Sequence, residues 1–176
     1  MSKRELRQGA VMGGAHRSKG NDEWITPKHI IDSVGISDLD PCSAIGQPWR
    51  TAGTQWTIED DGLSRQWFGS VWLNPPYGSA TGRWLERLRD HGNGIALIFA
   101  RTETKMFVEG AWGGADSMLF LHGRLWFHHK DGSRAKANSG APSVLLGYGS
   151  DATERLKLSG LAGSLVSDWE QSEVRK

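Results

Sequence analysis

The sequence predicts an α/β domain with a largely parallel central sheet. Apolar runs with strand character alternate along the chain with helix-like runs, which is typical of β-strands joined by crossover helices. With 176 residues and 38% hydrophobic content, the chain can bury one core of ordinary size. No internal repeat is visible. We therefore expect a single layered domain.

Strands are predicted where β-branched, aromatic and aliphatic residues cluster between turn residues. These runs cover residues 38–40, 70–73, 94–100, 117–121 and 143–148.

Helices are predicted between these strands. The run 28–34 follows Thr26 and Pro27, which we interpret as a cap residue and a proline at the first helical position. The run 81–91 places Trp84, Leu85 and Leu88 on one face and stops before a glycine. A third helix is predicted at 103–112.

The two ends of the chain differ in composition from its middle. Residues 1–22 contain several glycines and basic residues but few large apolar ones, so we expect a flexible basic arm that contacts phosphate or is simply solvated. Residues 23–150 form the predicted domain, and 151–176 a tail or short helix. The single cysteine, Cys42, excludes an internal disulfide, and we see no signal peptide or long apolar run. A soluble cytoplasmic protein is expected.

The stretch "WLNPPYG" places a stiff turn at the end of a predicted strand. Asn74, Pro75, Pro76 and Tyr77 follow the apolar run directly, and prolines fix φ and donate no hydrogen bond. Ligands of parallel sheets bind at the carboxyl ends of strands, so this turn is a candidate functional site. The alternative is a rigid loop terminator without further function.

A second candidate site follows an earlier strand. Asp40, Pro41 and Cys42 come at the end of the run 38–40, followed by the small residue Ser43. An acidic residue at such a strand tip suits a cationic amine or ribose hydroxyls. The dinucleotide fingerprint with three spaced glycines is absent, as is the Walker phosphate loop. Both nicotinamide-cofactor and nucleoside-triphosphatase classes are therefore unsupported.

Together these segments resemble the amino-group methyltransferases, most closely the phage-type DNA N6-adenine methyltransferase (Dam) family. The resemblance covers about residues 24–148 and includes "DEWITP", "DLDPCSA", "EDDGL", "WLNPPYG", "ALIFARTET", "GRLWF" and "APSVLLGYG". It implies a single Rossmann-like methyltransferase domain, S-adenosylmethionine as cofactor, DNA as substrate, and a bacterial or phage-infected host cell.

The resemblance also implies roles for the "NPPY" residues. An exocyclic adenine amine is a poor nucleophile, so the Asn74 side-chain oxygen and the Pro75 carbonyl would hold its two hydrogens and stabilise the developing charge. Pro76 would stiffen the turn, and Tyr77 would stack on a base flipped out of the duplex. No general base is required before methyl transfer.

The implied cofactor contacts are spread over three segments. Those at the methionine end are Trp24, Thr26 and Pro27; those at the floor are Asp40, Pro41, Cys42 and Ser43; and Asp61 would accept from the adenine amine. A ribose-binding acid has no clear candidate between residues 45 and 57, so Glu59 or Asp60 are alternatives. The alternative is that these carboxylates are solvated loop charges without a role in binding.

Cys42 also suggests a competing chemistry, since a Pro-Cys pair can supply the nucleophile of a cytosine C5 methyltransferase. Such a cysteine belongs at the strand end that "NPPY" occupies. We therefore interpret Cys42 as a small buried residue beside the cofactor.

Basic loops are the candidate contacts to double-stranded DNA. They contain Arg101, Thr102, Arg124, Lys130, Arg134 and Lys136. The alternative for residues 128–140 is an exposed mobile hairpin. His128 and His129 are adjacent and lack partners at metal spacing, so no metal is expected.

The chain is too short for a separate target-recognition domain, and we expect a monomer or weak homodimer. Three other functions stay open: methylation of an RNA amine, methylation of a protein glutamine amide, and a catalytically inactive DNA-binding relative.

Overall fold

The computed structural model describes residues 24–170, so the predicted basic arm at 1–22 lies outside the described residues. Within this range seven strands form one sheet in the order β2-β1-β3-β4-β6-β5-β7. The strands are β1 (Ser37–Asp40), β2 (Ala52–Gln55), β3 (Val71–Leu73), β4 (Gly94–Phe99), β5 (Ser117–Leu121), β6 (Ser143–Tyr148) and β7 (Gly163–Val166).

The half of the sheet from β2 to β4 is parallel throughout. Beyond β4 the pairings are antiparallel because β6 inserts between β4 and β5 with the opposite direction, and β7 reverses again against β5. Only β6 and β7 therefore oppose the common strand direction. The predicted α/β class with a Rossmann-like sheet, mostly parallel in its core, is confirmed.

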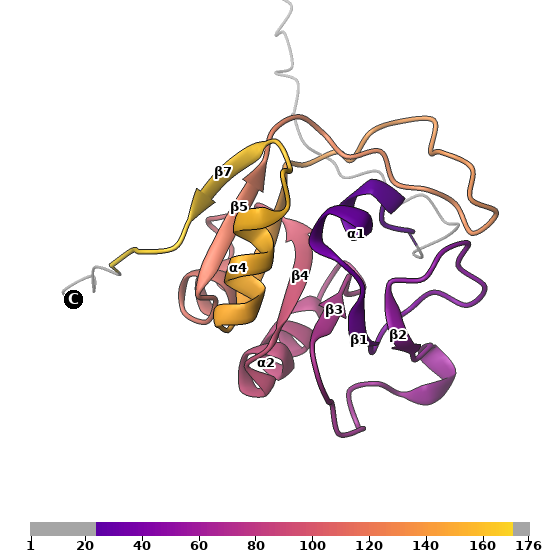
Figure 1. The fold of residues 1–176 in the computed structure, drawn as a ribbon, viewed down its shortest axis with the longest axis horizontal. Helices are drawn as coiled ribbons and strands as arrows, with labels where there is room; N and C mark the ends of the chain where they lie inside the picture. Colours follow the sequence, from indigo (N-terminus) through magenta and orange to yellow (C-terminus); the bar gives the residue numbers. More distant parts are fainter. Residues whose placement is uncertain (1–23, 171–176) are drawn as a thin grey trace, which may run out of the picture.

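Helices cover both faces of the sheet (Figure 1). On one face α1 (Lys28–Val34) and α4 (Ser150–Leu158) pack on Trp72, Ile95 and Leu97. On the other face α2 (Thr81–His91) packs with α3 (Lys105–Phe107) and the π-helical η2 (Val108–Trp112). Val71 and Leu73 point to this second face while Trp72 points to the first, as the two-residue period of a strand requires.

Several local expectations need correction. Strands β2 and β7 were not anticipated, and the helix expected from 103 begins at Lys105, where the Thr104 side chain caps it by accepting from the Phe107 amide at 3.3 Å. Pro27 is the N-cap of α1 and not its first helical residue. The chain after residue 150 forms α4 and then β7, which extends the sheet at its edge (Figure 1).

The topology creates a switch point between β1 and β3 at the carboxyl ends of these strands. Strand β1 pairs with β2 on one side and with β3 on the other, so the connections that leave β1 and β3 diverge. In open α/β sheets, ligands bind at this kind of switch point, outside the carboxyl ends of the strands. The "DPC" and "NPPY" segments follow β1 and β3 directly and lie at this point.

Candidate active site

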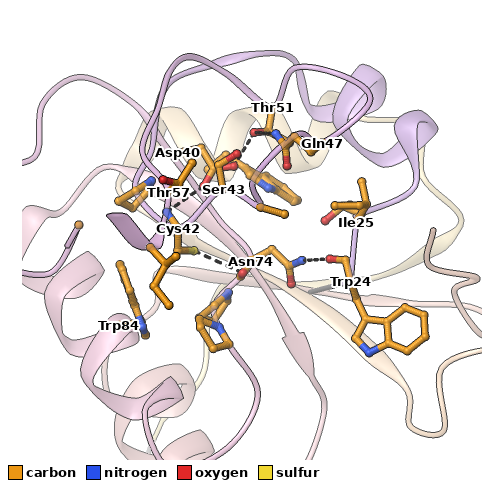
Figure 2. A pocket seen from close by; sticks show the side chains of 18 of the residues that line it. Trp24, Ile25, Asp40, Cys42, Ser43, Gln47, Thr51, Thr57, Asn74 and Trp84 are labelled. Atoms are coloured by element: carbon orange, nitrogen blue, oxygen red, sulfur yellow. Dashed lines mark hydrogen bonds between the residues drawn. The ribbon is translucent and has the colours of Figure 1, made fainter. Parts of the chain in front are cut away.

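A cavity of about 400 Å³ lies at the carboxyl ends of β1 and β3 (Figure 2). It brings together all of the predicted site residues from the "NPPY" turn and from the cofactor segments except Pro27. These residues are Trp24, Thr26, Asp40, Pro41, Cys42, Ser43, Asp61, Asn74, Pro75, Pro76 and Tyr77.

The Asn74 side chain is held in one orientation at the cavity wall. Its Nδ2 donates to the Trp24 carbonyl at 3.0 Å, as the dashed line in Figure 2 shows. Its Oδ1 is buried and has no hydrogen-bond partner. A buried amide oxygen without a donor is costly, so this atom is suited to accept from a bound ligand.

The turn after Asn74 is fixed by its own hydrogen bonds. The Thr81 hydroxyl at the start of α2 donates to the Pro76 carbonyl at 2.7 Å and accepts from the Gly78 amide at 3.1 Å. The thiol of Cys42 donates to the Asn74 backbone carbonyl at 3.3 Å. Contacts from the turn after β1 and from α2 thus hold both ends of the motif.

Tyr77 is part of an aromatic cluster. Its ring stacks on Phe99 with centroids 4.3 Å apart and planes inclined by 13°, and Phe127 lies edge-on at 6.5 Å. Its hydroxyl is buried without a partner, and burial raises the pKa of the phenol well above its ordinary value. The side chain therefore offers the cavity a neutral, rigidly backed ring.

Asp40 is a buried carboxyl at the tip of β1, with 3% of its surface exposed. It accepts from the Cys42 amide at 3.1 Å and from the Thr51 hydroxyl, and Gln47 Nε2 donates to that hydroxyl at 3.0 Å. Burial raises the pKa of Asp40 to about 7, against the lowering effect of these two hydrogen bonds. The carboxyl is therefore poised to change charge near neutral pH.

The "EDDGL" segment forms the rim of the cavity. Thr57 and Asp60 cap the short helix η1 (Ile58–Asp60) reciprocally, and Ile58 lines the cavity while 81% exposed. Asp61 follows with φ of +48°, the only non-glycine residue with positive φ among those described. A Cβ at Gly62 would overlap the Pro41 carbonyl oxygen, so only glycine lets the rim approach the turn after β1 this closely.

Of the three acids in this segment, only Asp61 lines the cavity. Asp60, one of the alternatives for the ribose, accepts from the Thr57 amide at 2.9 Å and pairs with Arg65 at 3.1 Å. Glu59, the other alternative, likewise does not line the cavity.

The Cys42 thiol lies in the cavity wall, partly buried. Burial and the neighbouring Asp40 raise its pKa well above the ordinary value. A thiolate nucleophile is disfavoured at this position, which agrees with our interpretation of Cys42 as a packing residue.

The six predicted DNA contacts lie outside the cavity and are all exposed. Four of them, from Arg124 to Lys136, belong to the long connection between β5 and β6, residues 122–142, drawn in orange in Figure 1. This connection is attached to the cavity wall by an antiparallel bridge between His128 and Ile25. Within it the Arg134 guanidinium lies 4.1 Å from the centroid of the Trp126 ring.

Sequence reasoning missed several residues of the cavity wall. They are Ile25, Ala44, Gln47, Thr51, Thr57, Ile58, Gly62, Trp72 and Trp84. Most follow β1 or flank β2, and recognition of β2 as the partner of β1 would have placed the flanking residues at the same edge.

Among residues 24–170, no group of three or more His, Cys, Asp or Glu side chains is arranged to hold a metal ion. The helices in that range are also too short or too polar to span a membrane.

The sheet with its switch-point cavity and "NPPY" turn defines a Rossmann-like methyltransferase domain. A family model described as "DNA N-6-adenine-methyltransferase (Dam)" matches residues 14–168, and the chain belongs to this family. The resemblance noted from the motifs is thereby confirmed. Membership implies adenine N6 methylation of DNA with S-adenosylmethionine. Searches of curated proteins and of solved structures gave no match.

Proposed function

We propose that this chain transfers a methyl group from S-adenosylmethionine to the N6 amine of adenine in double-stranded DNA, acting directly on a flipped base held by the "NPPY" motif. The observation that carries the proposal is the Asn74 side chain. Its Nδ2 is committed to the Trp24 carbonyl, which leaves Oδ1 buried and unpartnered at the cavity wall.

An acceptor in this position matches the chemistry of the amine. The N6 lone pair is delocalised into the ring, and the nitrogen becomes nucleophilic only as its hydrogens are held and it rehybridises. Asn74 Oδ1 and the Pro75 carbonyl accept these two hydrogens, and both oxygens stabilise the positive charge that develops on N6. The proton leaves for water after transfer, so no general base is assigned.

Tyr77 provides the stacking surface for the base. Phe99 covers one face of the phenol ring at 4.3 Å, so the adenine packs on the other face. Stacking contributes about 1–3 kcal/mol per base. This offsets much of the cost of flipping, which is on the order of a few kcal/mol.

The remaining cavity residues fit the cofactor, which supplies an electrophilic methyl group when bound. The Asp40 carboxyl suits a cationic amine, and Asp61 at the rim suits the adenine amine. Trp24, Thr26, Pro41, Cys42 and Ser43 complete the wall, and the exposed Ile58 offers an apolar surface at the rim. Pro27 does not line the cavity, so its role is to start α1 behind Thr26.

The exposed basic residues extend the site toward duplex DNA. We assign phosphate contacts to Arg101, Thr102, Arg124, Lys130, Arg134 and Lys136, which lie on two connections that follow β4 and β5. Phosphate contacts orient the duplex but do not by themselves read its sequence.

The test is tritiated methyl transfer to unmethylated plasmid DNA, followed by nucleoside analysis. We expect label in N6-methyldeoxyadenosine. Asn74→Ala should lower the transfer rate by about a hundredfold or more, the range for loss of one aligned transition-state hydrogen bond. Calorimetric affinity for S-adenosylmethionine should change little.

Asn93→Ala is the matched control, because Asn93 Oδ1 is also buried and unpartnered but lies outside the cavity, before β4. It should retain the wild-type rate. Label in C5-methylcytosine, label only in protein, or equal losses in the two variants would refute the assignment.

A further inference from the structure

Residues 24–26, which we term the strap, cross the cavity wall as a short extended segment. Four hydrogen bonds hold the strap. The Trp24 carbonyl accepts from Asn74 Nδ2 at 3.0 Å, Ile25 exchanges two backbone hydrogen bonds of 3.0 Å with His128, and the Thr26 carbonyl accepts from the Trp49 indole at 3.0 Å. Each strap residue is thus tied to a different part of the chain.

The first of these bonds decides which way the Asn74 amide faces. If the amide turned over, Oδ1 would meet the Trp24 carbonyl, and two acceptors would oppose each other at about 3 Å without a hydrogen between them. The amide NH₂ would then face the cavity, where it cannot accept from an amine. The strap carbonyl therefore selects the orientation that presents Oδ1.

Trp49 holds the strap in place from outside the cavity. It does not line the cavity, and its indole N–H is the donor that fixes the Thr26 carbonyl. Its ring also lies edge-on against His128, with centroids 5.1 Å apart at 84°, and His128 is the residue that grips Ile25. One side chain therefore supports the strap both directly and through the 122–142 connection.

We propose that Trp49 is a positioning residue that orients the Asn74 amide through the strap. This inference rests on the proposed role of Asn74 Oδ1 as the amine acceptor. Because Trp49 contacts neither the cavity nor the reacting atoms, its loss should impair turnover more than it weakens the binding of either substrate.

The test compares Trp49→Phe with a matched control. Phenylalanine keeps an aromatic ring but removes the indole donor. In Trp169→Phe the same type of bond is lost, since the Trp169 indole donates to the Trp112 carbonyl at 3.0 Å beside η2. Both variants should lose similar stability.

Two readouts separate positioning from general destabilisation. We expect Trp49→Phe to lower kcat about tenfold. The KM for DNA and the calorimetric affinity for S-adenosylmethionine should change less, by about threefold at most, because Trp49 also supports Thr26 and the 122–142 connection. Hydrogen exchange of the Asn74 side-chain amide, followed by NMR on ¹⁵N-labelled protein, should accelerate at least tenfold. Trp169→Phe should leave kcat and this exchange unchanged.

Wild-type kcat and exchange in Trp49→Phe would overturn the inference, as would equal effects in the two variants. If Trp49→Phe does not fold, 3-benzothienylalanine at position 49 keeps the indole shape without the N–H and is subject to the same criteria. If the wild-type protein methylates no DNA, the proposed function fails, yet the exchange of the Asn74 amide still decides whether Trp49 orients it.

Discussion

Of the two carboxyl groups that line the cavity, Asp40 is buried and Asp61 is exposed. Asp40 is buried at a strand tip, yet only a hydroxyl and one backbone amide donate to it in the described structure. Desolvation therefore prevails over hydrogen bonding and raises the pKa to about 7. A cationic cofactor amine would favour the ionised form and thus bind with a dependence on pH.

We predict that affinity for S-adenosylmethionine rises as the pH increases from about 6 to 8, because the ionised Asp40 attracts the amine. Calorimetry across this range measures the effect. In Asp40→Asn the rise should disappear, whereas Asp61→Asn, which removes another cavity carboxylate, should still show it. A rise that persists in Asp40→Asn would contradict the assignment.

The same titration affects folding with the opposite sign. The unfolded chain loses the Asp40 proton near pH 4, whereas the folded protein keeps it up to about pH 7. Because the folded state binds more protons between these values, the Asp40 contribution to stability falls as the pH rises from about 4 to 7. Urea unfolding should show this decline in the wild type and a smaller one in Asp40→Asn.

The sequence predicted the residues of the "NPPY" turn but not the hydrogen bonds that orient them. Four adjacent letters and a preceding apolar run are local information, so the sequence alone indicates Asn74 to Tyr77 as candidates. The Trp24 carbonyl and the Trp49 indole act across 50 and 23 residues of chain, respectively. Such hydrogen bonds depend on how the strands are ordered in the sheet, so they cannot be predicted from the residues of the motif.

Helix η1 and the two residues that follow it, Asp61 and Gly62, form one rim of the cavity. Gly62 approaches the Pro41 backbone directly, and Asp61 adopts positive φ to make this possible. A residue such as Asp61 in this conformation is strained by on the order of 1 kcal/mol or more. Thr57 and Asp60 cap η1 at its start and so fix the segment that leads into Asp61.

We predict that Gly62→Ala displaces the rim, because the new Cβ would overlap the Pro41 carbonyl. Affinity for S-adenosylmethionine should fall at least tenfold by calorimetry, with a loss of stability in the usual 1–3 kcal/mol range for overpacking. Gly82 lies in helix α2, and a Cβ added there would have the flexible Met106 side chain of α3 as its nearest neighbour, at 3.9 Å. We therefore expect unchanged affinity and a slight gain in stability for Gly82→Ala. Wild-type affinity in Gly62→Ala would show that the rim does not bound the cofactor site.

The elements themselves were predicted unevenly, for physical reasons. Helix α2 has an apolar face and ends at Gly92 with φ of +76°, and its predicted bounds are confirmed. Strand β2 reads "AGTQ", with one buried residue and a glycine, and is a strand only because β1 offers its edge. Strand β7 forms likewise against β5. Pairing created these edge strands, and the sequence pattern alone did not specify them.

The two halves of the sheet have different roles in the molecule. The parallel half from β2 to β4 carries the cavity, while the antiparallel half supplies the 122–142 connection that reaches back to the strap. The basic residues on this connection are therefore linked structurally to the cavity wall. A formal net charge of +1 means that any attraction to DNA must come from such local clusters and not from the overall charge.

This arrangement predicts how salt affects DNA binding. Lys136 is exposed on the 122–142 connection, and neutralising one phosphate contact changes the slope of log affinity against log salt by about 0.9 for duplex DNA. Fluorescence anisotropy with a labelled duplex at 50–200 mM salt should show a slope lower by about that amount in Lys136→Ala, with unchanged affinity for S-adenosylmethionine. Arg89 is the control, because it lies in the last turn of α2, next to the amino end of β4 and away from the cavity. Arg89→Ala should keep the wild-type slope. Equal slopes in all three proteins would remove Lys136 from the DNA interface, whereas a reduced slope only in Lys136→Ala places the duplex across the connection that holds the strap.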